Sequence, residues 1–493
     1  MQKFWGGLLV VGLALMGCAR TKLQNIDVFF IADVQGFYFS RPEPRLDNQK
    51  AGGYGILKNF LQNRSQNFLL FDGGNWFGSG AEGMLSKAAY VPVLSKSIPF
   101  TAGTVTDKDL AYGWPVARNL IKELNYPFVV ANLKLDRQIP WPLHDYQIHN
   151  VSDIKIGIFG LMAPFKKDQE RLPGLSVSDP IETASQMTAL LKEKGVDVVI
   201  VLSSLEDTAS GGGNAALAAE VEGIDLILSS NQDNEAPELD TINHTHIVYP
   251  GSKLDSIGHI VLGLDKNKQL KKVSFTDEPL LKSKYGEDEI IAREAERLLS
   301  STRKQMSRPV AKAEREITTD LTAQSPLGEL LATCLHRWAK LDGVILNAAS
   351  IRSSLPAGQI TEFDLYKTYP YGDNITFITM KGAPLAKALQ ASLNAADNFP
   401  QIAGFRVQYA QTSSGKRITR ITLDNGRIVR PQETYRMAVT DHILAGGFGH
   451  EEFINALEFK STFVEARQIM RSCLVRQKNI EVPDVKGRWE QTP

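Results

Sequence analysis

The chain has 493 residues, which is too long for one ordinary domain and long enough for two domains with complete hydrophobic cores. Its 55 basic and 55 acidic side chains give a formal net charge of zero. No global electrostatic field therefore draws nucleic acid or an anionic membrane surface, and we expect no nucleic-acid partner. An anionic ligand would have to be held by a local group of charges.

The first residues have the pattern of a lipoprotein signal peptide. A lysine precedes an apolar stretch, residues 4–16, which is too short to cross a bilayer as a helix. The stretch ends in Leu15-Met16-Gly17-Cys18, the pattern of a bacterial lipobox. We expect residues 1–17 to be removed and Cys18 to be acylated, which would anchor the protein in the cell envelope, in the outer membrane facing the periplasm. A plain signal peptide with an incidental cysteine is the alternative.

Short apolar runs alternate with helical patterns from Ile26 to about Asp265. By length and β-branched content, the following runs are predicted strands: Ile26–Ile31, Phe68–Phe71, Phe128–Val130, Ile154–Phe159, Val196–Leu202, Ile224–Leu228 and His246–Tyr249. The predicted helices between them are Tyr54–Gln62, Trp114–Leu124, Ile181–Lys194 and Ala215–Glu222. This alternation predicts a layered α/β domain over residues 24–265, with functional loops at the strand ends.

The character of the sequence changes after Asp265. Residues 266–284 are polar and are predicted to be irregular, and Glu287–Met306 has the pattern of a charged amphipathic helix, so we expect residues 266–307 to form a linker. A second domain is expected over residues 308–485. Its predicted elements are helix Leu327–Lys340, strand Val344–Leu346 and helix Ala383–Leu393.

Two cysteines, Cys334 and Cys473, remain outside the signal peptide. Cys334 lies in the predicted amphipathic helix Leu327–Lys340, where a buried free thiol is the more common state. Because an oxidising compartment also permits a disulfide, pairing of the two thiols is the open alternative.

Motifs along both halves carry a resemblance to a known family. Polar loops follow the apolar runs at Asp33-Val34-Gln35, Asp72-Gly73-Gly74-Asn75, Thr106-Asp107-Lys108-Asp109 and Ser229-Ser230-Asn231-Gln232-Asp233. In the second half stand Asn347-Ala348-Ala349-Ser350-Ile351-Arg352, Ala357-Gly358-Gln359-Ile360-Thr361, Tyr369-Pro370-Tyr371-Gly372-Asp373-Asn374, Phe399-Pro400-Gln401-Ile402-Ala403-Gly404 and Gly446-Gly447-Phe448-Gly449. In this order they resemble the bacterial 5'-nucleotidase/UDP-sugar hydrolase family. The resemblance implies an α/β chain with an N-terminal four-layer α-β-β-α metallophosphatase-like domain, a linker helix and a C-terminal α+β domain.

The same resemblance implies where a two-metal phosphatase site would lie. The family's metal positions fall here on Asp33, Gln35, Asn75, Asp107, Ser204, Asn231 and Asp233, and Lys108 stands where the family has a catalytic histidine. Only the first aspartate of this set is retained. Because the imidazoles and the bridging carboxylate are replaced, we do not expect a two-metal transition-metal centre or ordinary two-metal hydrolysis.

The replacements at these positions all carry oxygen, the ligand atom that calcium and magnesium prefer. A single hard divalent cation is therefore one hypothesis for the site. Solvated loop residues that cap helices and turns are the alternative. Lys108 would repel a metal, but it could hold a phosphate or carboxylate without one.

The C-terminal domain of the family binds the nucleoside, which implies a second set of positions here. These are Asn347, Arg352, Phe399, His442 and Phe448. The planar donor fork of Arg352 suits a phosphate or carboxylate, and Phe399 and His442 would stack on a base. The alternative is that Phe399 and Phe448 are core aromatic residues.

Three functions remain open at this point. The first is an envelope lipoprotein that binds a nucleotide-like or other small anionic ligand between its domains, with lost or altered hydrolysis. The second is an active phosphoester hydrolase with an unusual metal site, and the third is a structural lipoprotein that binds an unidentified protein partner. We favour the first, because most of the family's metal positions are replaced in this chain while the surrounding motifs remain.

Overall fold

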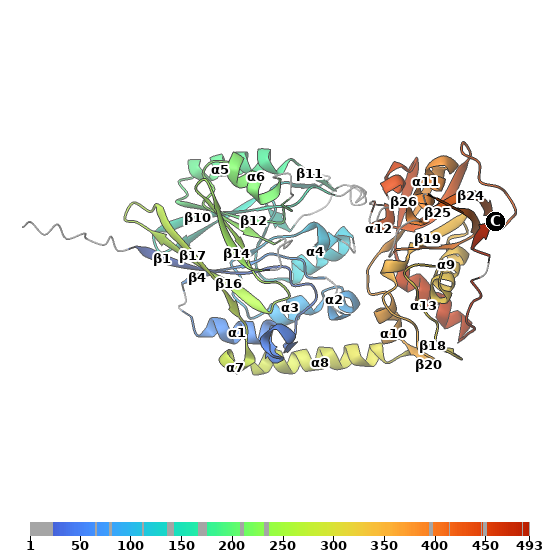
Figure 1. The fold of residues 1–493 in the computed structure, drawn as a ribbon. Coiled ribbons are helices and arrows are strands. Elements are labelled where there is room, and N and C mark those ends of the chain that lie inside the picture. Colours follow the sequence, from blue (N-terminus) through green and yellow to red (C-terminus); the bar gives the residue numbers. More distant parts are fainter. Residues whose placement is uncertain are drawn as a thin grey trace, which may run out of the picture.

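In the computed structural model, an N-terminal and a C-terminal domain lie side by side, and a long helix runs along the N-terminal domain and ends at the C-terminal domain (Figure 1). The structure describes residues 23–492 except 65–66, 78–80, 111–112, 136–141, 166–174, 208–211, 231–235, 394–397, 414, 445, 447–450 and 486. Cys18, Asn231, Asp233 and Phe448 therefore lie outside the described residues. In the described part of the chain, no helix is long and apolar enough to cross a membrane.

Two mixed β-sheets form the centre of the N-terminal domain. The seven-stranded sheet has the order β17 (Leu270–Pro279), β16 (Ser256–Leu264), β1 (Gln24–Ile31), β4 (Phe68–Asp72), β5 (Ala102–Gly103), β6 (Phe128–Val129) and β8 (Leu143–His144). The six-stranded sheet has the order β14 (Glu238–Ile242), β15 (Thr245–Tyr249), β13 (Leu226–Ser229), β12 (Val198–Ser203), β10 (Ile154–Leu161) and β9 (Tyr146–Val151). Two small two-stranded sheets join β2 (Arg41–Glu43) with β3 (Gln49–Ala51) and β7 (Leu133–Leu135) with β11 (Leu175–Val177).

Three apolar cores hold the layers of this domain together. Facing strands of the two sheets enclose the first core, which includes Val28, Phe71, Ile156 and Val248. On the outer face of the seven-stranded sheet, the second core is covered by α1 (Tyr54–Gln62), α3 (Tyr90–Ser95), α4 (Trp114–Glu123) and α8 (Glu289–Met306). On the far face of the six-stranded sheet, the third core is covered by α5 (Pro180–Glu193) and α6 (Gly213–Glu220). The predicted four-layer α-β-β-α arrangement is therefore confirmed.

The prediction that residues 266–284 are irregular was wrong. The segment contains β17, which pairs with β16 in antiparallel register with one irregularity near its start, and the short helix α7 (Lys282–Tyr285). β17 lies at the edge of the sheet, where one face is exposed, so most of its side chains are polar. The sequence of β17 therefore contains no short apolar run that would predict a strand, although Val273 and Phe275 pack against the inter-sheet core.

The C-terminal domain is built on a five-stranded sheet. Its order is β22 (Pro400–Ala403), β19 (Gly343–Asn347), β25 (Thr434–Thr440), β21 (Asn374–Lys381) and β26 (Glu458–Glu465). The helices are α9 (Pro326–Ala339), α10 (Glu362–Thr368), α11 (Gly382–Leu393), α12 (Asp441–Leu444) and α13 (Ala466–Gln477). Two three-stranded sheets complete it, β20 (Gly358–Thr361), β18 (Pro309–Ala313) and β27 (Asn479–Ile480), and β24 (Gly415–Leu423), β23 (Phe405–Thr412) and β28 (Trp489–Thr492).

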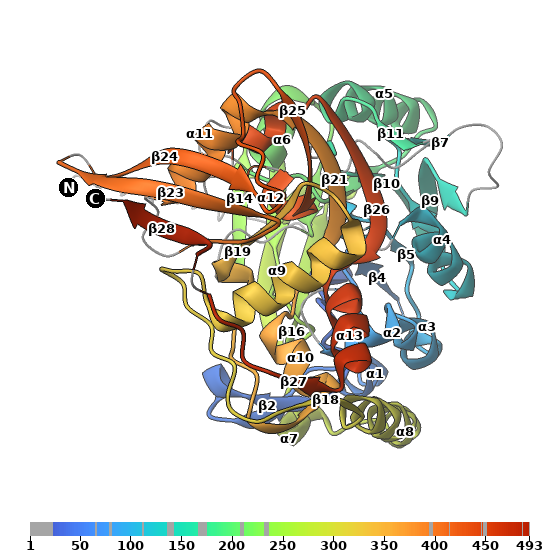
Figure 2. The same cartoon turned by 90° about the vertical axis from the view of Figure 1, so that its right-hand side faces the viewer.

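Helices α9 and α13 pack against each other, as Figure 2 shows, and a disulfide joins them. It connects Cys334 with Cys473, so the expectation of a buried free thiol at Cys334 was wrong. The amphipathic pattern placed Cys334 correctly inside a buried helix, but it carried no information about the facing helix, 139 residues further along the chain. The bond closes a long loop, for which the stabilisation is typically about 2–4 kcal/mol.

Candidate functional site

Loops that follow parallel strands meet at one edge of the N-terminal domain. β1 pairs in parallel with β4, where Ile31 lies opposite Asp72, and β4 pairs in parallel with β5, where Asp72 lies opposite Gly103. The loop after β13 reaches the same place, since a Cβ built on Gly73 would lie 2.8 Å from the hydroxyl oxygen of Ser230. The strand-end loops of both sheets are therefore neighbours, as expected for a functional site in an α/β domain.

Three of the expected metal positions form one hydrogen-bonded group, which we call the Asp33 cluster: Asp33, Gln35 and Asn75. The side-chain amide of Asn75 donates to one carboxylate oxygen of Asp33, and the amide of Gln35 donates to the other. The backbone N–H of Gln35 also donates to the carbonyl of Asn75, at 2.7 Å. Asp33 and Asn75 are both 4% exposed. Both oxygens of the retained carboxylate are thus occupied by neutral amide donors.

The backbone of the Asp33 cluster is unusual for non-glycine residues. Asp33, Gln35 and Asn75 have φ angles of 51°, 51° and 54°, in the left-handed region. Such conformations cost of order 1 kcal/mol or more each and persist where surrounding contacts enforce them, most often at functional sites. The hydrogen bonds within the cluster provide that enforcement, and they fix where the three side chains point.

A second buried carboxylate, Asp109, supports the loop that carries Asn75. Its two oxygens accept from the backbone N–H groups of Asn75 and Trp76, each at 2.8 Å, and from the N–H and hydroxyl of Thr106 at 3.0 and 2.9 Å. Burial raises the pKa of Asp109 from 3.8 to about 7, although these hydrogen bonds act in the opposite direction. Asp109 therefore holds the Asn75 loop in place. In the described part of the chain, no ion pair compensates the charge of its buried carboxylate.

Asp72, at the end of β4, is the third buried carboxylate at this edge. It accepts from the N–H of Gly74, the indole N–H of Trp76 and the hydroxyl of Tyr126, at 2.9, 3.0 and 2.6 Å. Burial raises its pKa, and it also raises the pKa of Tyr126 well above its ordinary value. Asp72 thus anchors the floor of the site through neutral donors as well.

The remaining expected positions come from two other strand-end loops. Asp107 is buried and Lys108 is exposed, on a single 3-10 turn, Asp107–Leu110. Ser204 is buried, and its hydroxyl accepts from the N–H of Ala163 at 3.2 Å and donates to the carbonyl of Leu161 at 3.5 Å. These bonds tie the end of β12 to the end of β10. The positions 231 and 233 of the fourth loop are outside the described residues.

The C-terminal positions lie around the end of β19. Asn347 is fully buried and accepts from the hydroxyl of Ser350 at 2.9 Å. Arg352 is exposed; its backbone N–H donates to the carbonyl of Thr368 at 2.8 Å, and its guanidinium makes a 3.4 Å contact with the carbonyl of Ala349. The loop is therefore fixed through its backbone while the charged end of Arg352 faces solvent.

The two expected stacking residues differ in their surroundings. Phe399 is 5% exposed and packs edge-on against Trp489, with ring centroids 4.9 Å apart. Its position is fixed further by backbone hydrogen bonds from Phe399 to Leu321 and from Ala348 to Phe399. His442 lies on the one-turn helix α12 and is half-buried. Phe399 thus packs against Trp489 and lies beside the Arg352 loop.

Comparison with known proteins agrees with this architecture. Residues 304–457 match the family model of the 5'-nucleotidase C-terminal domain. The chain is 23% identical to a 5'-nucleotidase of Vibrio cholerae over an alignment of 411 residues that covers 73% of each protein. It is 22% identical to the trifunctional nucleotide phosphoesterase of Bacillus subtilis over 82% of this chain, but spans only 33% of that longer protein.

A solved structure extends the comparison to the whole fold. A Staphylococcus aureus protein provisionally assigned as a 5'-nucleotidase, crystallised with α-ketoglutarate, has a TM-score of 0.75. It is 18% identical and covers 95% of this chain and 100% of its own. The resemblance to the 5'-nucleotidase/metallophosphatase family is confirmed.

The described residues of this 5'-nucleotidase-like chain do not fit a two-metal transition-metal centre. Such a centre needs imidazole, thiolate or shared carboxylate ligands. Over the described ranges, no group of three or more histidine, cysteine, aspartate or glutamate side chains is placed to hold a metal ion. In addition, the amides of Gln35 and Asn75 point their N–H groups at Asp33, where a cation would require oxygen. A single hard cation stays a prediction, because positions 231 and 233 belong to the undescribed loop.

Sequence reasoning missed two residues that organise this 5'-nucleotidase-like site. Asp72 and Asp109 were noticed only as parts of polar loops, yet each is fully buried and accepts three or more hydrogen bonds. Their position directly at or after a strand end was the available signal. Their partners, however, come from other parts of the chain: Tyr126 donates to Asp72, and Asn75 and Trp76 donate to Asp109.

Proposed function

We propose that the protein binds a nucleotide-like or other small anionic ligand and does not carry out two-metal hydrolysis. The observation that carries this proposal is the Asp33 cluster. A metal ion at Asp33 would have to displace two amide N–H donors and rotate both amides, and no group of three or more histidine, cysteine, aspartate or glutamate side chains among the described residues is placed to hold it. The hydrogen bonds make the retained aspartate part of a closed network of neutral donors.

The C-terminal domain supports the binding half of the proposal. Arg352 presents its guanidinium to solvent from a loop with a fixed backbone, an arrangement that suits recognition of a phosphate or carboxylate. Beneath the same loop, the side-chain N–H groups of Asn347 and Asn398 are buried and have no hydrogen-bond partner among the described residues. Each such donor costs about 1–3 kcal/mol, so the loop beneath Arg352 is held at a cost in stability, as is common at functional sites.

Within this proposal, the residues have distinct roles. Arg352 would hold the anionic group, and the buried Asn347 and Asn398 would support its loop from beneath. His442 would contact the base through its ring, while Phe399, held by Trp489, would support the site from beneath. Lys108 would attract the anion from the N-terminal domain without a metal.

Calorimetry with adenosine 5'-monophosphate, combined with an assay for released phosphate, tests the proposal. We expect binding without release of phosphate, and a loss of affinity of about tenfold or more in Arg352→Ala. Arg406→Ala, which removes an exposed arginine from β23, is the matched control and should bind like the wild type. Metal-dependent release of phosphate would support the active hydrolase instead. Absence of binding would favour the partner-binding lipoprotein.

We further propose that the protein is anchored in the cell envelope through Cys18, in the outer membrane facing the periplasm. The support is the lipobox pattern of the sequence, which lies outside the described residues. Cys18→Ala should move the protein from the membrane fraction to the soluble fraction and abolish labelling by radioactive palmitate. A variant that stays membrane-bound and labelled would contradict the proposal.

A further inference from the structure

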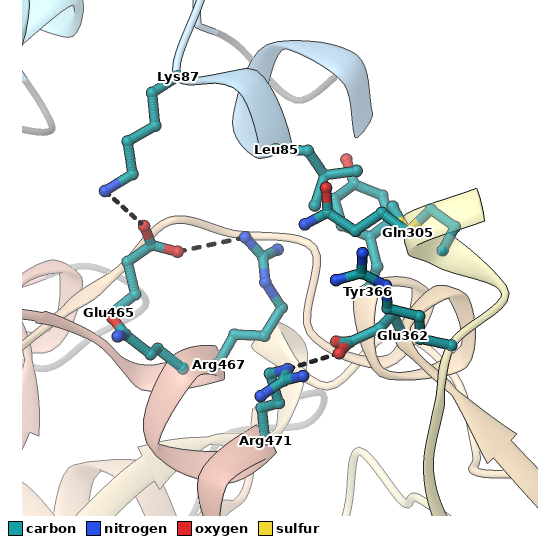
Figure 3. A pocket seen from close by; sticks show the side chains of 11 residues that line it. Leu85, Lys87, Gln305, Glu362, Tyr366, Glu465, Arg467 and Arg471 are labelled. Atoms are coloured by element: carbon teal, nitrogen blue, oxygen red, sulfur yellow. Dashed lines mark hydrogen bonds and ion pairs between the residues drawn. The ribbon is translucent and has the colours of Figure 1, made fainter. Parts of the chain in front are cut away.

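A cavity of about 310 Å³ lies where the two domains and the linker helix meet (Figure 3). We call it the junction cavity. The N-terminal domain contributes Leu85 from α2 (Ala81–Ser86) and the following Lys87; the linker contributes the end of α8; and the C-terminal domain contributes α10 and the start of α13. No member of the Asp33 cluster lines this cavity, and neither does Arg352.

Positive charge outnumbers negative charge around the junction cavity. Its charged lining consists of four cations, Lys87, Arg308, Arg467 and Arg471, and two carboxylates, Glu362 and Glu465. Each carboxylate is already paired: Glu362 with Arg471 at 2.5 Å, and Glu465 with Arg467 at 3.3 Å and with Lys87 at 3.9 Å (Figure 3). The side chain of Arg308 forms no ion pair with a residue in the described part of the chain. Among the lining residues, cations thus exceed carboxylates by two.

The guanidinium at the back of the junction cavity is held in place before any ligand arrives. Arg467 donates to the carbonyls of Tyr369 and Pro370, at 3.1 and 3.2 Å, and lies over the ring of Tyr366, 5.1 Å from its centroid. Its side chain is only 12% exposed. A fixed arginine loses little conformational freedom on binding, and its planar donors suit phosphate oxygens. By contrast, Lys87 and Arg471 at the opening are about half exposed and can adjust to a ligand.

We propose that the junction cavity is a binding site for a small phosphate-bearing anion, held by Lys87 of the N-terminal domain together with Arg308, Arg467 and Arg471. The excess of two positive charges favours a ligand with two or more negative charges, and the volume suits a molecule of the size of pyrophosphate or a small phosphate ester. Because the ligand would contact cations of both domains, its binding would stabilise this relative position of the domains. The site is independent of the nucleotide-like ligand proposed above.

Titration of the full-length protein with pyrophosphate tests this site. We expect binding that weakens as salt is added, and at least a tenfold loss of affinity in Arg308→Ala and in Lys87→Ala. Both side chains are exposed enough for the variants to fold. Arg352→Ala should keep the wild-type affinity for pyrophosphate. Loss of binding in Arg352→Ala with no effect of the other two changes would place the anion elsewhere and overturn the proposal, as would no binding at millimolar pyrophosphate.

Hydrogen exchange separates a bridging ligand from one held by the C-terminal domain alone. In the wild type, pyrophosphate should slow exchange both in the segment around Lys87 and at the start of α13. In Lys87→Ala, any remaining protection should be confined to α13 and α10. If pyrophosphate protects only the C-terminal elements of the wild type, the proposal that the ligand bridges the domains is contradicted.

Discussion

At the strand ends, Asp33 and Asp109 accept hydrogen bonds from amides, a hydroxyl and backbone N–H groups, whereas at the junction cavity Glu362 and Glu465 face arginine and lysine. Neutral donors satisfy the hydrogen-bonding capacity of a carboxylate but leave its charge uncompensated, which is why burial raises the pKa of Asp109 to about 7. At the junction the cations exceed the carboxylates. The strand-end region thus satisfies its carboxylates with neutral donors, whereas the excess of cations at the junction cavity favours an anion.

The largest expected effect concerns pH and the strand-end region. Because the folded-state pKa of Asp109 is raised from 3.8 to about 7, the unfolded chain releases this proton first, and stability is lost as pH rises between these values. At about 1.36 kcal/mol for each pH unit, the loss attributable to Asp109 by pH 8 is roughly 4 kcal/mol. Hydrogen exchange of β4 amides in wild type and Asp109→Asn at pH 4, 6 and 8 measures it.

The difference between wild type and Asp109→Asn should therefore be greatest at pH 4 and shrink as pH rises. Asp47→Asn, at an exposed aspartate, is the control and should follow the wild type at every pH. A difference that stays constant or grows with pH would mean that a cation compensates Asp109 in the folded protein.

The next largest effect is expected for Asn75→Asp, which restores the carboxylate implied by the family pattern. It would place a second carboxylate against Asp33 in a buried position and destabilise the N-terminal domain by about 3 kcal/mol without metal. Because two facing carboxylates attract divalent ions, calcium or manganese should recover part of this loss in a thermal shift assay. Asn48→Asp is the control, because Asn48 is exposed but also has a left-handed backbone. It should change stability by less than about 0.5 kcal/mol, and the metal should not shift its melting temperature.

At the junction cavity we expect Glu465→Gln to strengthen pyrophosphate binding. The change removes the carboxylate that pairs with Lys87 and Arg467, one of the two in the cavity lining, so affinity should rise about tenfold, equivalent to about 1.4 kcal/mol. Glu296→Gln, which removes an exposed carboxylate from α8 outside the cavity, is the control. Weaker binding in Glu465→Gln would show that the carboxylate positions the cations and that charge excess is not the cause of binding.

The smallest effect is expected for Ser204→Ala. Its hydroxyl joins the ends of β12 and β10, so its loss should cost about 1 kcal/mol. Titrations of Ser204→Ala with nucleotide or with calcium should give the same affinity as titrations of the wild type. A change in calcium binding would instead make Ser204 a ligand of a hard cation, and the strand-end region would then resemble an ion site more than a closed network.

The sequence predicted the elements whose side chains are buried on both sides or along one helical face. Tyr54–Gln62 was predicted with the bounds that the structure gives to α1, and the buried strands β1, β10 and β12 were found within a few residues, because uninterrupted β-branched runs mark them. By contrast, β17 is half-exposed at a sheet edge and was missed. Burial on one face of an edge strand leaves too weak a pattern for such prediction.

Of the candidate site, sequence identified the loops but not their internal connections. The alignment of motifs placed Asp33, Gln35 and Asn75 at one site, and the structure joins them. That their amides would donate to the aspartate depends on left-handed backbone angles, which residue types alone do not specify. The junction cavity was invisible because Lys87 and Arg467 are 380 residues apart and meet only through domain packing.

Metal analysis of the purified protein, made alongside a phosphate-release assay on adenosine 5'-monophosphate, tests the central claim most directly. If the amides of Gln35 and Asn75 close the site around Asp33, the protein should contain no stoichiometric zinc, manganese or iron and should release no phosphate when these ions are added. Two equivalents of such a metal together with metal-dependent turnover would contradict the account.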